Sequence, residues 1–460
     1  MAFGRRRFVA SLTAGSAAYL GGCTPSGVVA PAGDGGTGCP TPFTPVPPVL
    51  RYPSSTYFDG LSGQLDARTV GTPVVLVDLD RLEENVRAIA SGIRPHAFRI
   101  VEKSLPSIDL LRHVTQVAEQ EGAEHFLVLH LPFLGPLLDA FPGADVLVGK
   151  THLPGAIERF LRDRASPADA ARRVTFLVDG PDRLAGLVAL AGALGVRLRL
   201  AIELDVGLRR SGLREPADLA PMLATFQSSA SAVELVGLLG YDGHVAHSPT
   251  ASAAGVIEAW SEATSKFQEF VDVLVGQFSG LVTDDFLFHS GGSSTYPLYS
   301  DPTRPTPVND VATGGGVLRP GEYPDYFLGD LSPAIFVAAP ALRVYRAPDA
   351  PPEIPFFDAA TNARLFGGRT GVTVYGGGWA SYFSYPSMGP VPLSGGGGSG
   401  CSWVPNQGLV TVAADVDIED GDWIYYHPVS SDVLFQFERI HLVRDGVLQP
   451  ETWAAYPRRY

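Results

Sequence analysis

The chain has 460 residues, of which 45% are hydrophobic and 18% charged, and 34 Lys and Arg against 48 Asp and Glu give a formal net charge of -14. The apolar fraction is sufficient for two hydrophobic cores, which excludes a chain that is disordered throughout. The acidic balance argues against nucleic acid as a partner, because binding phosphate groups requires a surplus of positive charge. With three cysteines, a disulfide framework is excluded as well.

The first 23 residues have the features of an export signal. Arg5 and Arg6 precede a mildly apolar stretch over residues 10–20, which is too short for a permanent membrane-spanning helix. The paired arginines resemble a twin-arginine signal, and Leu-Gly-Gly-Cys at residues 20–23 resembles a lipobox, in which Cys23 receives the lipid. We therefore expect an exported lipoprotein, periplasmic or in the cell envelope, whose membrane contact is its lipid anchor. The alternative is an ordinary cleaved signal with an incidental Cys23.

Residues 24–55 are predicted to be a flexible linker. Pro, Gly and Thr dominate this segment and few apolar residues could anchor it. If Cys23 carries a lipid, Cys39 and Cys401 remain, and they could pair outside the cytoplasm. The sequence does not give the distance between them, so this pairing stays open.

Eight apolar runs in the first two thirds of the chain are predicted strands, and most are separated by helical stretches such as residues 108–120 and 181–194. The runs cover residues 74–77, 98–101, 126–129, 146–148, 174–178, 198–202, 235–239 and 286–288. Eight strand–helix units over roughly 240 residues match the size of a (β/α)8 TIM barrel, which we place at residues 70–312. Asp80, with Glu83 three residues later, is expected to cap the first helix. An open doubly wound sheet is the competing α/β fold, but no glycine-rich dinucleotide fingerprint follows the first run.

Beyond residue 316 the helical periodicity fades, and short apolar runs punctuated by Gly and Pro replace it. These runs cover residues 334–337, 342–345, 371–375, 409–412, 423–426 and 440–443. The pattern predicts a C-terminal antiparallel β domain over residues 313–460, which residues 56–69 could join.

Functional side chains of a barrel gather at the C-terminal ends of its strands. Lys103 follows the run at residues 98–101, where partial desolvation would make it a candidate for Schiff-base chemistry, with a surface lysine as the plain alternative. Tyr241 and His244 follow a later run and are either acid–base groups or parts of a hydrogen-bonded corner. Backbone amides and hydroxyls that could hold a phosphate follow the last run, at Gly291, Gly292, Ser293, Ser294 and Thr295.

Together these motifs resemble the fold-type-III pyridoxal-phosphate enzymes, the alanine racemase N-terminal-domain superfamily, over about residues 70–445. They are Gly-Thr-Pro at 71–73, Lys103, Asp-Val-Gly-x-x-Arg-x-Gly at 205–212, Gly-Tyr-Asp-Gly-His at 240–244, Gly-Gly-Ser-Ser-Thr at 291–295 and Leu-Arg-Pro-Gly at 318–321. Within the superfamily the chain is similar to the D-threonine aldolase and D-serine dehydratase branch, which includes proteins labelled amino acid deaminase/aldolase.

The resemblance implies pyridoxal 5′-phosphate as the cofactor, with Lys103 as the aldimine lysine and Arg210 near the cofactor. It implies that Tyr241 and His244 flank the reacting carbon, that Tyr241 also contacts the cofactor, and that residues 291–295 surround the phosphate. Gly321 and Glu322 are expected beside that phosphate too.

The similar branch also binds a divalent metal, zinc or manganese, through a histidine and a nearby cysteine or aspartate of the β domain. The resemblance therefore implies His427 and Asp432 as ligands, although Val429 stands at the expected second position. A structural His427 is the alternative, because two ligands do not define a site.

The expected activity is that of a lyase on a small-molecule amino-acid substrate: aldol cleavage or dehydration of a D-3-hydroxy amino acid. Lys103 would act as the base at Cα, and His244 would remove the β-hydroxyl proton. An amino-acid racemase is the alternative, with its second proton carrier, a tyrosine, contributed by the partner subunit of a homodimer. A non-catalytic lipoprotein that binds pyridoxal phosphate is the second alternative.

Overall fold

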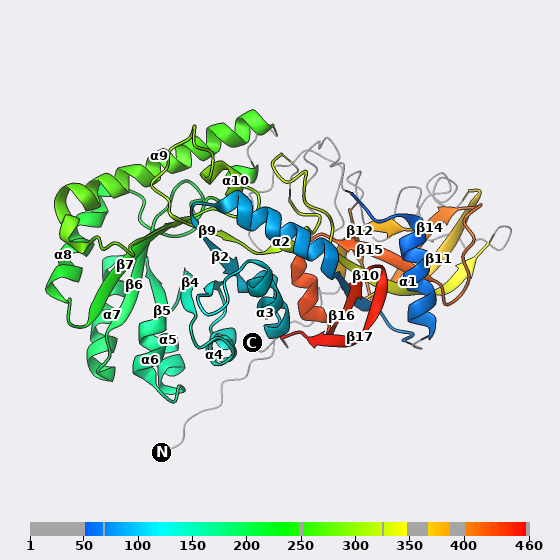
Figure 1. Ribbon diagram of the computed structural model, residues 1–460, viewed down its shortest axis with the longest axis horizontal. Coiled ribbons are helices and arrows are strands. Elements are labelled where there is room, and N and C mark those ends of the chain that lie inside the picture. The colour runs from blue at the N-terminus through cyan, green and yellow to red at the C-terminus, as the bar shows by residue number, and fades with distance from the viewer. Residues whose placement is uncertain are drawn as a thin grey trace, which may run out of the picture.

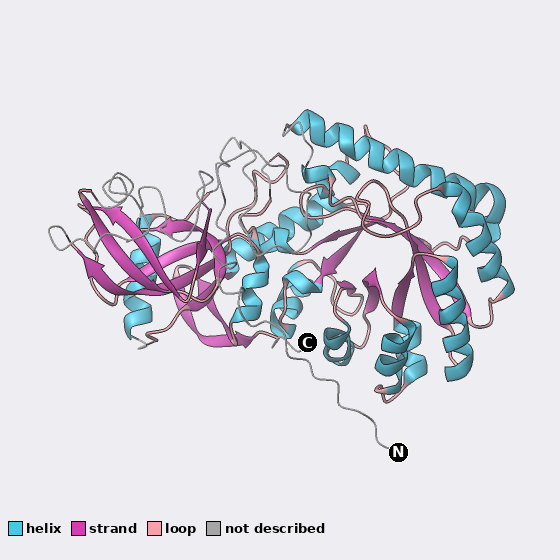
Figure 2. Ribbon diagram, turned by 180° about the vertical axis from the view of Figure 1, so that it is seen from behind, coloured by secondary structure: helices cyan, strands magenta, loops and turns pink. Residues whose placement is uncertain are grey.

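The computed structural model describes residues 51–67, 70–247, 252–323, 326–346, 367–386 and 401–456. A closed barrel surrounded by helices lies beside a separate sheet (Figures 1 and 2). The export signal, Cys23 and Cys39 lie outside the described residues, so lipidation and pairing with Cys401 remain predictions. No helix within the described ranges is long and apolar enough to cross a membrane.

Eight parallel strands form the barrel in chain order and confirm the predicted TIM-barrel fold. β9 closes the ring by pairing in parallel with β2, so that Ala97 lies opposite Asp310. The strands are β2 (Ala97–Val101), β3 (His125–Val128), β4 (Asp145–Thr151), β5 (Val174–Val178), β6 (Leu198–Glu203), β7 (Val233–Gly240), β8 (Leu287–Ser290) and β9 (Asp310–Thr313).

The barrel differs from the predicted one by a strand at each end. β1 (Val74–Asp78), which was expected to open the barrel, lies instead in the C-terminal sheet, antiparallel to β10 (Ile335–Tyr345) and parallel to β16 (Arg439–Arg444). All residues of β1 are buried, so its continuous apolar run suits a buried strand in either sheet. The remaining barrel strand is β9, which spans only 4 residues and was not predicted.

Helices surround the barrel and follow most of its strands (Figure 1). They are α2 (Leu79–Ile93), α3 (Ile108–Val117), α4 (Leu131–Ala140), α5 (Pro154–Arg162), α6 (Pro167–Arg173), α7 (Pro181–Leu194), α8 (Leu219–Ser228), α9 (Ala253–Phe278), α10 (Tyr296–Tyr299) and α11 (Gly315–Leu318). Short 3-10 helices are η1 (Glu102–Ser104), η2 (Pro216–Asp218), η3 (Val245–His247), η4 (Ser279–Leu281) and η5 (Ser431–Gln436).

The cap of α2 is Asp78 and not the predicted Asp80. The carboxylate of Asp78 accepts a hydrogen bond from the backbone N–H of Arg81 at 3.1 Å. Asp80 instead accepts one from Arg444 of β16 at 2.9 Å. Asp80 therefore ties the barrel helix to the C-terminal sheet.

The C-terminal sheet contains nine strands among the described residues, in the order β13-β12-β15-β10-β1-β16-β17 with β11 on β10 and β14 on β11. The strands not yet given are β11 (Arg369–Tyr375), β12 (Trp379–Tyr385), β13 (Cys401–Val404), β14 (Gln407–Ala413), β15 (Trp423–Pro428) and β17 (Val447–Ala454). The parallel β1–β16 pair makes this a mixed sheet and not the purely antiparallel one expected. Helix α1 (Ser55–Ala67) packs on it through Phe58, Leu61 and Leu65.

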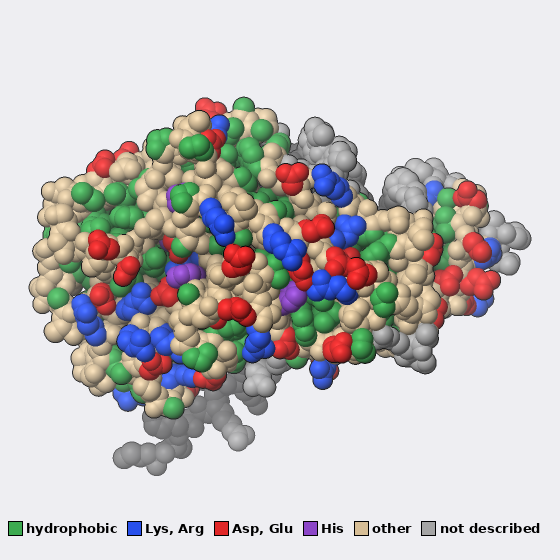
Figure 3. Space-filling model, viewed as in Figure 1, with side chains coloured by type: hydrophobic (Ala, Val, Ile, Leu, Met, Phe, Trp, Pro, Cys, Tyr) green, Lys and Arg blue, Asp and Glu red, His purple; other side chains and the backbone are tan. Residues whose placement is uncertain are grey.

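Side chains fill the interior of the barrel below the C-terminal ends of its strands. A layer of apolar side chains from several strands includes Leu127, Leu147 and Ala312. Nearer the strand starts, the fully buried Arg99 pairs with Asp310 at 2.8 Å and with Asp145 at 2.9 Å. On the molecular face in Figure 3, Lys and Arg side chains lie among Asp and Glu and form no extended basic surface.

Candidate active site

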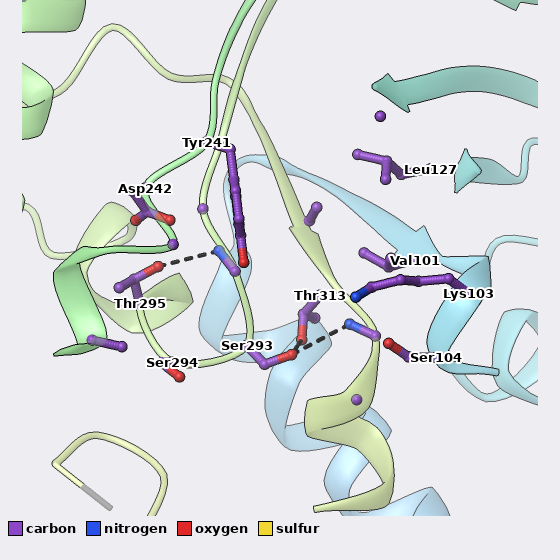
Figure 4. A pocket seen from close by; sticks show the side chains of 18 of the residues that line it. Val101, Lys103, Ser104, Leu127, Tyr241, Asp242, Ser293, Ser294, Thr295 and Thr313 are labelled. Atoms are coloured by element: carbon purple, nitrogen blue, oxygen red, sulfur yellow. Dashed lines mark hydrogen bonds between the residues drawn. The ribbon is translucent and has the colours of Figure 1, made fainter. Parts of the chain in front are cut away.

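A cavity of about 280 Å³ opens at the C-terminal ends of the barrel strands (Figure 4). Its floor includes the apolar side chains of Leu127, Leu239 and Ala312. The predicted site residues that line it are Lys103, Arg210, Tyr241, Gly291, Gly292, Ser293, Ser294, Thr295 and Glu322. Segments far apart in the sequence therefore share one cavity, and the roles predicted for these residues remain to be tested.

Lys103 lies in η1, directly after β2, and its side chain reaches into the cavity toward Thr313 (Figure 4). The turn is closed by the backbone N–H of Leu105, which donates to the carbonyl of Glu102 at 2.8 Å. The neighbouring Glu102 is fully buried, and burial raises its pKa well above the ordinary range. Burial of Glu102 therefore disfavours a negative charge directly beside Lys103.

Two loops rich in glycine and hydroxyl groups meet on one side of the cavity, after β8 and after β9. Ser293 joins them, because its hydroxyl lies 2.7 Å from that of Thr313 and accepts from the backbone N–H of Gly316 at 3.0 Å. Among the described residues, the backbone amides of Ser293, Ser294 and Gly315 have no hydrogen-bond partner. Unpartnered N–H groups beside hydroxyls suit the oxygens of a phosphate group.

Arg210 reaches the cavity from the turn after β6. Its guanidinium lies over the Tyr241 ring, 5.3 Å from the ring centroid. The turn is held by Asp205, whose carboxylate accepts from the backbone N–H of Gly207 at 3.0 Å and of Arg209 at 2.8 Å. The buried Glu203 lies at the end of the same strand, and burial raises its pKa while Ser211 and Arg210 act in the opposite direction.

The predicted base His244 does not line the cavity, whereas His247 does. A Cβ atom added to Gly207 would lie 2.6 Å from Nε2 of His244, so this ring packs against the turn after β6. His247 ends η3, three positions further along the chain. The His-x-x-His spacing places the two side chains one helical turn apart, and this was the signal that could have identified His247. Burial lowers the pKa of His247.

His289 at the end of β8 is a second cavity residue that the sequence did not single out. Its Nδ1 donates to Asp310 across 2.5 Å, and Arg99 donates to the same carboxylate at 2.8 Å. Burial opposes ionisation of Asp310, but Arg99 and His289 outweigh it and lower the pKa below the ordinary value. The ionised Asp310 fixes the ring of His289 and leaves its Nε2 for a bound molecule.

Glu322 and Tyr323 line the cavity from the segment that leads into the C-terminal sheet. The backbone N–H of Glu322 donates to the carbonyl of Val429 at 2.8 Å. Burial raises the pKa of Glu322 to about 7, with Asp432 adding to the shift and Lys103 opposing it. Gly321, predicted to contact the phosphate, does not line the cavity: a Cβ atom there would lie 2.3 Å from the Tyr382 ring, so packing requires the glycine.

The predicted metal ligands do not form a metal site. Nε2 of the fully buried His427 lies 2.8 Å from the carbonyl oxygen of Arg319, and Nδ1 lies 2.9 Å from the hydroxyl of Tyr52. A carbonyl only accepts, so Nε2 carries the proton and Nδ1 accepts from Tyr52. Both ring nitrogens are thus engaged, and the described residues contain no group of three or more His, Cys, Asp or Glu that could hold a metal ion. Asp432 is exposed.

Comparison with known proteins agrees with this fold. Residues 77–296 match the family described as "Alanine racemase, N-terminal domain". The 3-hydroxy-D-aspartate aldolase of Paracoccus denitrificans (strain Pd 1222) is 26% identical over 184 residues, which are 40% of this chain and 46% of that protein. The match thus spans about half the length of this curated relative.

Solved structures of the same fold are similar over most of the chain. D-threonine aldolase from Filomicrobium marinum has a TM-score of 0.61 at 16% identity and covers 84% of this chain and 96% of its own. D-threo-3-hydroxyaspartate dehydratase from Delftia sp. HT23 has a TM-score of 0.57 at 18% identity, with 85% and 98% covered. Alanine racemases are also among the similar structures.

The barrel and the sheet beside it therefore have the fold seen in these similar structures. Residues 77–296 of this chain match the alanine racemase N-terminal domain, and the resemblance seen in the sequence motifs is confirmed.

Proposed function

We propose that the chain is a pyridoxal 5′-phosphate-dependent lyase that cleaves or dehydrates a D-3-hydroxy amino acid. The observation that carries the proposal is one cavity in which Lys103 faces two loops suited to a phosphate, with acid–base side chains on other walls. The relatives named above include an aldolase and a dehydratase for 3-hydroxyaspartate and an aldolase for D-threonine. When bound, the cofactor would supply the electron sink for bond breaking at Cα.

The residues present fit this cofactor. The amine of Lys103 would attach to its aldehyde, and the amides of Ser293, Ser294 and Gly315 would receive the phosphate oxygens. The stacked Arg210 and Tyr241 would border its ring. These groups follow five different strands, β2, β6, β7, β8 and β9, so the closed barrel is what brings them together.

His247 and Glu322 are the side chains that we propose to act at the β-hydroxyl of the substrate. Cleavage of the Cα–Cβ bond requires a base there, whereas dehydration requires an acid for the departing hydroxide. Burial lowers the pKa of His247, which favours the neutral imidazole that a base requires. Glu322, with a pKa raised by burial to about 7, can serve in either direction near neutral pH. Because His427 does not fit a metal, we assign no step to a metal ion.

We propose that Lys150 favours a substrate with an acidic side chain. Lys150 lies near the end of β4, and burial together with the charges of Lys103 and Arg210 lowers its pKa. β4 stands on the far side of the barrel from β8 and β9, which carry the phosphate loops. A positive charge on Lys150, opposite the phosphate loops, would favour a dicarboxylic substrate such as 3-hydroxyaspartate.

A substrate panel tests the proposal. The protein, loaded with pyridoxal 5′-phosphate, is incubated with D and L isomers of 3-hydroxyaspartate, threonine, serine and alanine. An aldolase releases glycine and an aldehyde, whereas a dehydratase releases a 2-oxo acid and ammonia. Interconversion of alanine enantiomers without either product would replace the lyase by the racemase alternative. A bound cofactor with no turnover of any amino acid would favour the non-catalytic binding protein.

We also propose that the protein is exported and anchored by lipid at Cys23, and that it forms a homodimer. The twin-arginine-like signal and the lipobox in residues 1–23 support the first proposal. Twin-arginine export carries folded proteins, which would allow the cofactor to be loaded before translocation. The second proposal rests on resemblance alone, and sedimentation or light scattering of the exported protein tests it.

A further inference from the structure

We infer that His427 is a positioning residue for one wall of the cavity and that no metal ion binds at this end of β15. Tyr52, His427 and the carbonyl of Arg319 form one hydrogen-bonded series. This series occupies the place where the similar branch was expected to hold its metal. The inference rests on the proposed function only for its kinetic readout.

The surroundings of His427 suit a neutral imidazole. The Tyr52 ring meets the imidazole edge-on with centroids 5.4 Å apart, and Phe336 and Tyr382 lie 6.1 and 6.4 Å away. A metal ion at Nδ1 would have to displace the Tyr52 hydroxyl, and a metal ion at Nε2 would have to displace a proton and the Arg319 carbonyl. Val429, two residues further on, offers no ligand atom.

Arg319 is the residue that His427 holds. It is fully buried and has a left-handed backbone conformation with φ 49° and ψ 57°, which is unfavourable for a residue with a Cβ atom. Such a conformation persists only where surrounding contacts enforce it. The hydrogen bond from His427 Nε2 to the Arg319 carbonyl supplies one of these contacts.

The segment after Arg319 carries this constraint to the cavity. Gly321 and Glu322 donate backbone hydrogen bonds to the carbonyls of Pro428 at 2.9 Å and Val429 at 2.8 Å, so the segment lies along the end of β15. Tyr323 follows and covers the phosphate-side loop: a Cβ atom added to Gly315 would lie 2.2 Å from its hydroxyl. His427 therefore acts on the cavity through Glu322 and Tyr323, without touching a ligand itself.

The experiment uses the full chain without a lipid on Cys23 and loaded with pyridoxal 5′-phosphate. It measures the bound metal, the thermal unfolding and the visible absorption of the cofactor. The variants are Tyr52→Phe, which removes one hydroxyl, His427→Gln, which keeps a donor and an acceptor, and His427→Leu, which keeps neither. Tyr375→Phe on β11 is the matched control, since that tyrosine is 40% exposed.

We expect far less than one equivalent of zinc or manganese per purified chain, and a melting temperature that a chelator leaves unchanged. Tyr52→Phe should lower the melting temperature by about 2 °C relative to Tyr375→Phe and shift the cofactor absorption. His427→Leu should lower kcat severalfold at nearly unchanged cofactor content, and His427→Gln should recover part of this loss.

One equivalent of metal in the wild-type protein, lost in His427→Leu, would overturn the inference. The positioning role would be overturned as well if Tyr52→Phe and His427→Leu had the same melting temperature and cofactor spectrum as the control variant. If no 3-hydroxy amino acid is turned over, the proposed function fails, but metal content, melting and absorption still decide this inference.

Discussion

The hydroxyl of Ser293 lies 2.7 Å from the hydroxyl of Thr313, and this contact joins the loop after β8 to the end of β9. The same serine oxygen accepts from the backbone N–H of Gly316 at 3.0 Å. A single buried side chain thereby sets the spacing of the two loops proposed to hold the cofactor phosphate.

Ser293→Ala should weaken cofactor binding about tenfold or more, because it leaves a buried backbone N–H without its acceptor and frees the two loops, at a cost of about 1–3 kcal/mol. Titration of the cofactor-free protein with pyridoxal 5′-phosphate, followed by absorption, measures the change. Ser261→Ala on the exposed face of α9 is the control. Equal affinity of the two variants would show that Ser293 does not organise the site.

Lys103→Ala should remove the covalent attachment of the cofactor while the protein remains folded, because the side chain extends into the cavity. Borohydride reduction followed by peptide mapping should place the label on the peptide that contains Lys103 in the wild-type protein, and no label should remain in the variant. A label that persists in Lys103→Ala would transfer the role to Lys150, near the end of β4.

Lys150→Ala should raise KM for 3-hydroxy-D-aspartate about tenfold relative to D-threonine, because it removes positive charge near the expected position of the side-chain carboxylate. The ratio of the two KM values separates this effect from general damage. Lys266→Ala, on α9 outside the barrel, serves as the control. A ratio that is the same in both lysine variants would argue against an acidic substrate.

Acid should destabilise the wild-type protein partly through His427. Burial lowers its pKa to about 4 in the folded state, while the unfolded chain has the ordinary value of about 6.5. Between these values the unfolded state binds the additional proton, so the free energy of unfolding falls as pH falls, by about 3 kcal/mol in total from this group. Denaturant titrations at pH 7 and pH 4.5 measure the fall, which should be smaller in His427→Gln. The same fall in both proteins would contradict the assignment of a buried, neutral imidazole.

Replacement of Arg5 and Arg6 by lysine should block export, and Cys23→Ser should release the exported protein from membrane lipid. Cell fractionation with labelling of lipid-modified protein provides the measurement. Unmodified wild-type protein retained in the cytoplasm would contradict the predicted location.

The sequence was informative wherever local pattern determines structure. The helix at 181–194 and the strand at 174–178 have the predicted bounds, because caps, glycines and apolar periodicity act over a few residues. The exchange of β1 for β9 shows the limit. A continuous apolar run indicates a buried strand but not the sheet in which it is buried. The 4-residue β9 begins with Asp310, whose charge is paired by Arg99 and His289, and Arg99 is distant in the sequence.

The site was predictable to the extent that its residues stand directly at strand ends. Lys103 and Ser293 are of this kind, and the barrel topology brought them together. His247 and His289 were missed because their approach to the cavity depends on the η3 turn and on the pairing with Asp310. The metal prediction was made from His427 without its hydrogen-bond partners. One of these partners, Tyr52, lies 375 residues away in the sequence, so local pattern does not identify it.

The most direct test of the proposed lyase is the reaction of 3-hydroxy-D-aspartate in heavy water, followed by NMR with the wild-type protein and with Lys103→Ala in parallel. The account predicts that the wild-type protein forms either glycine with one deuterium at Cα, together with glyoxylate, or oxaloacetate and ammonia, and that Lys103→Ala forms neither. Deuterium entering Cα of a substrate whose carbon skeleton remains whole, with no glycine and no oxo acid, would contradict the account and identify a racemase.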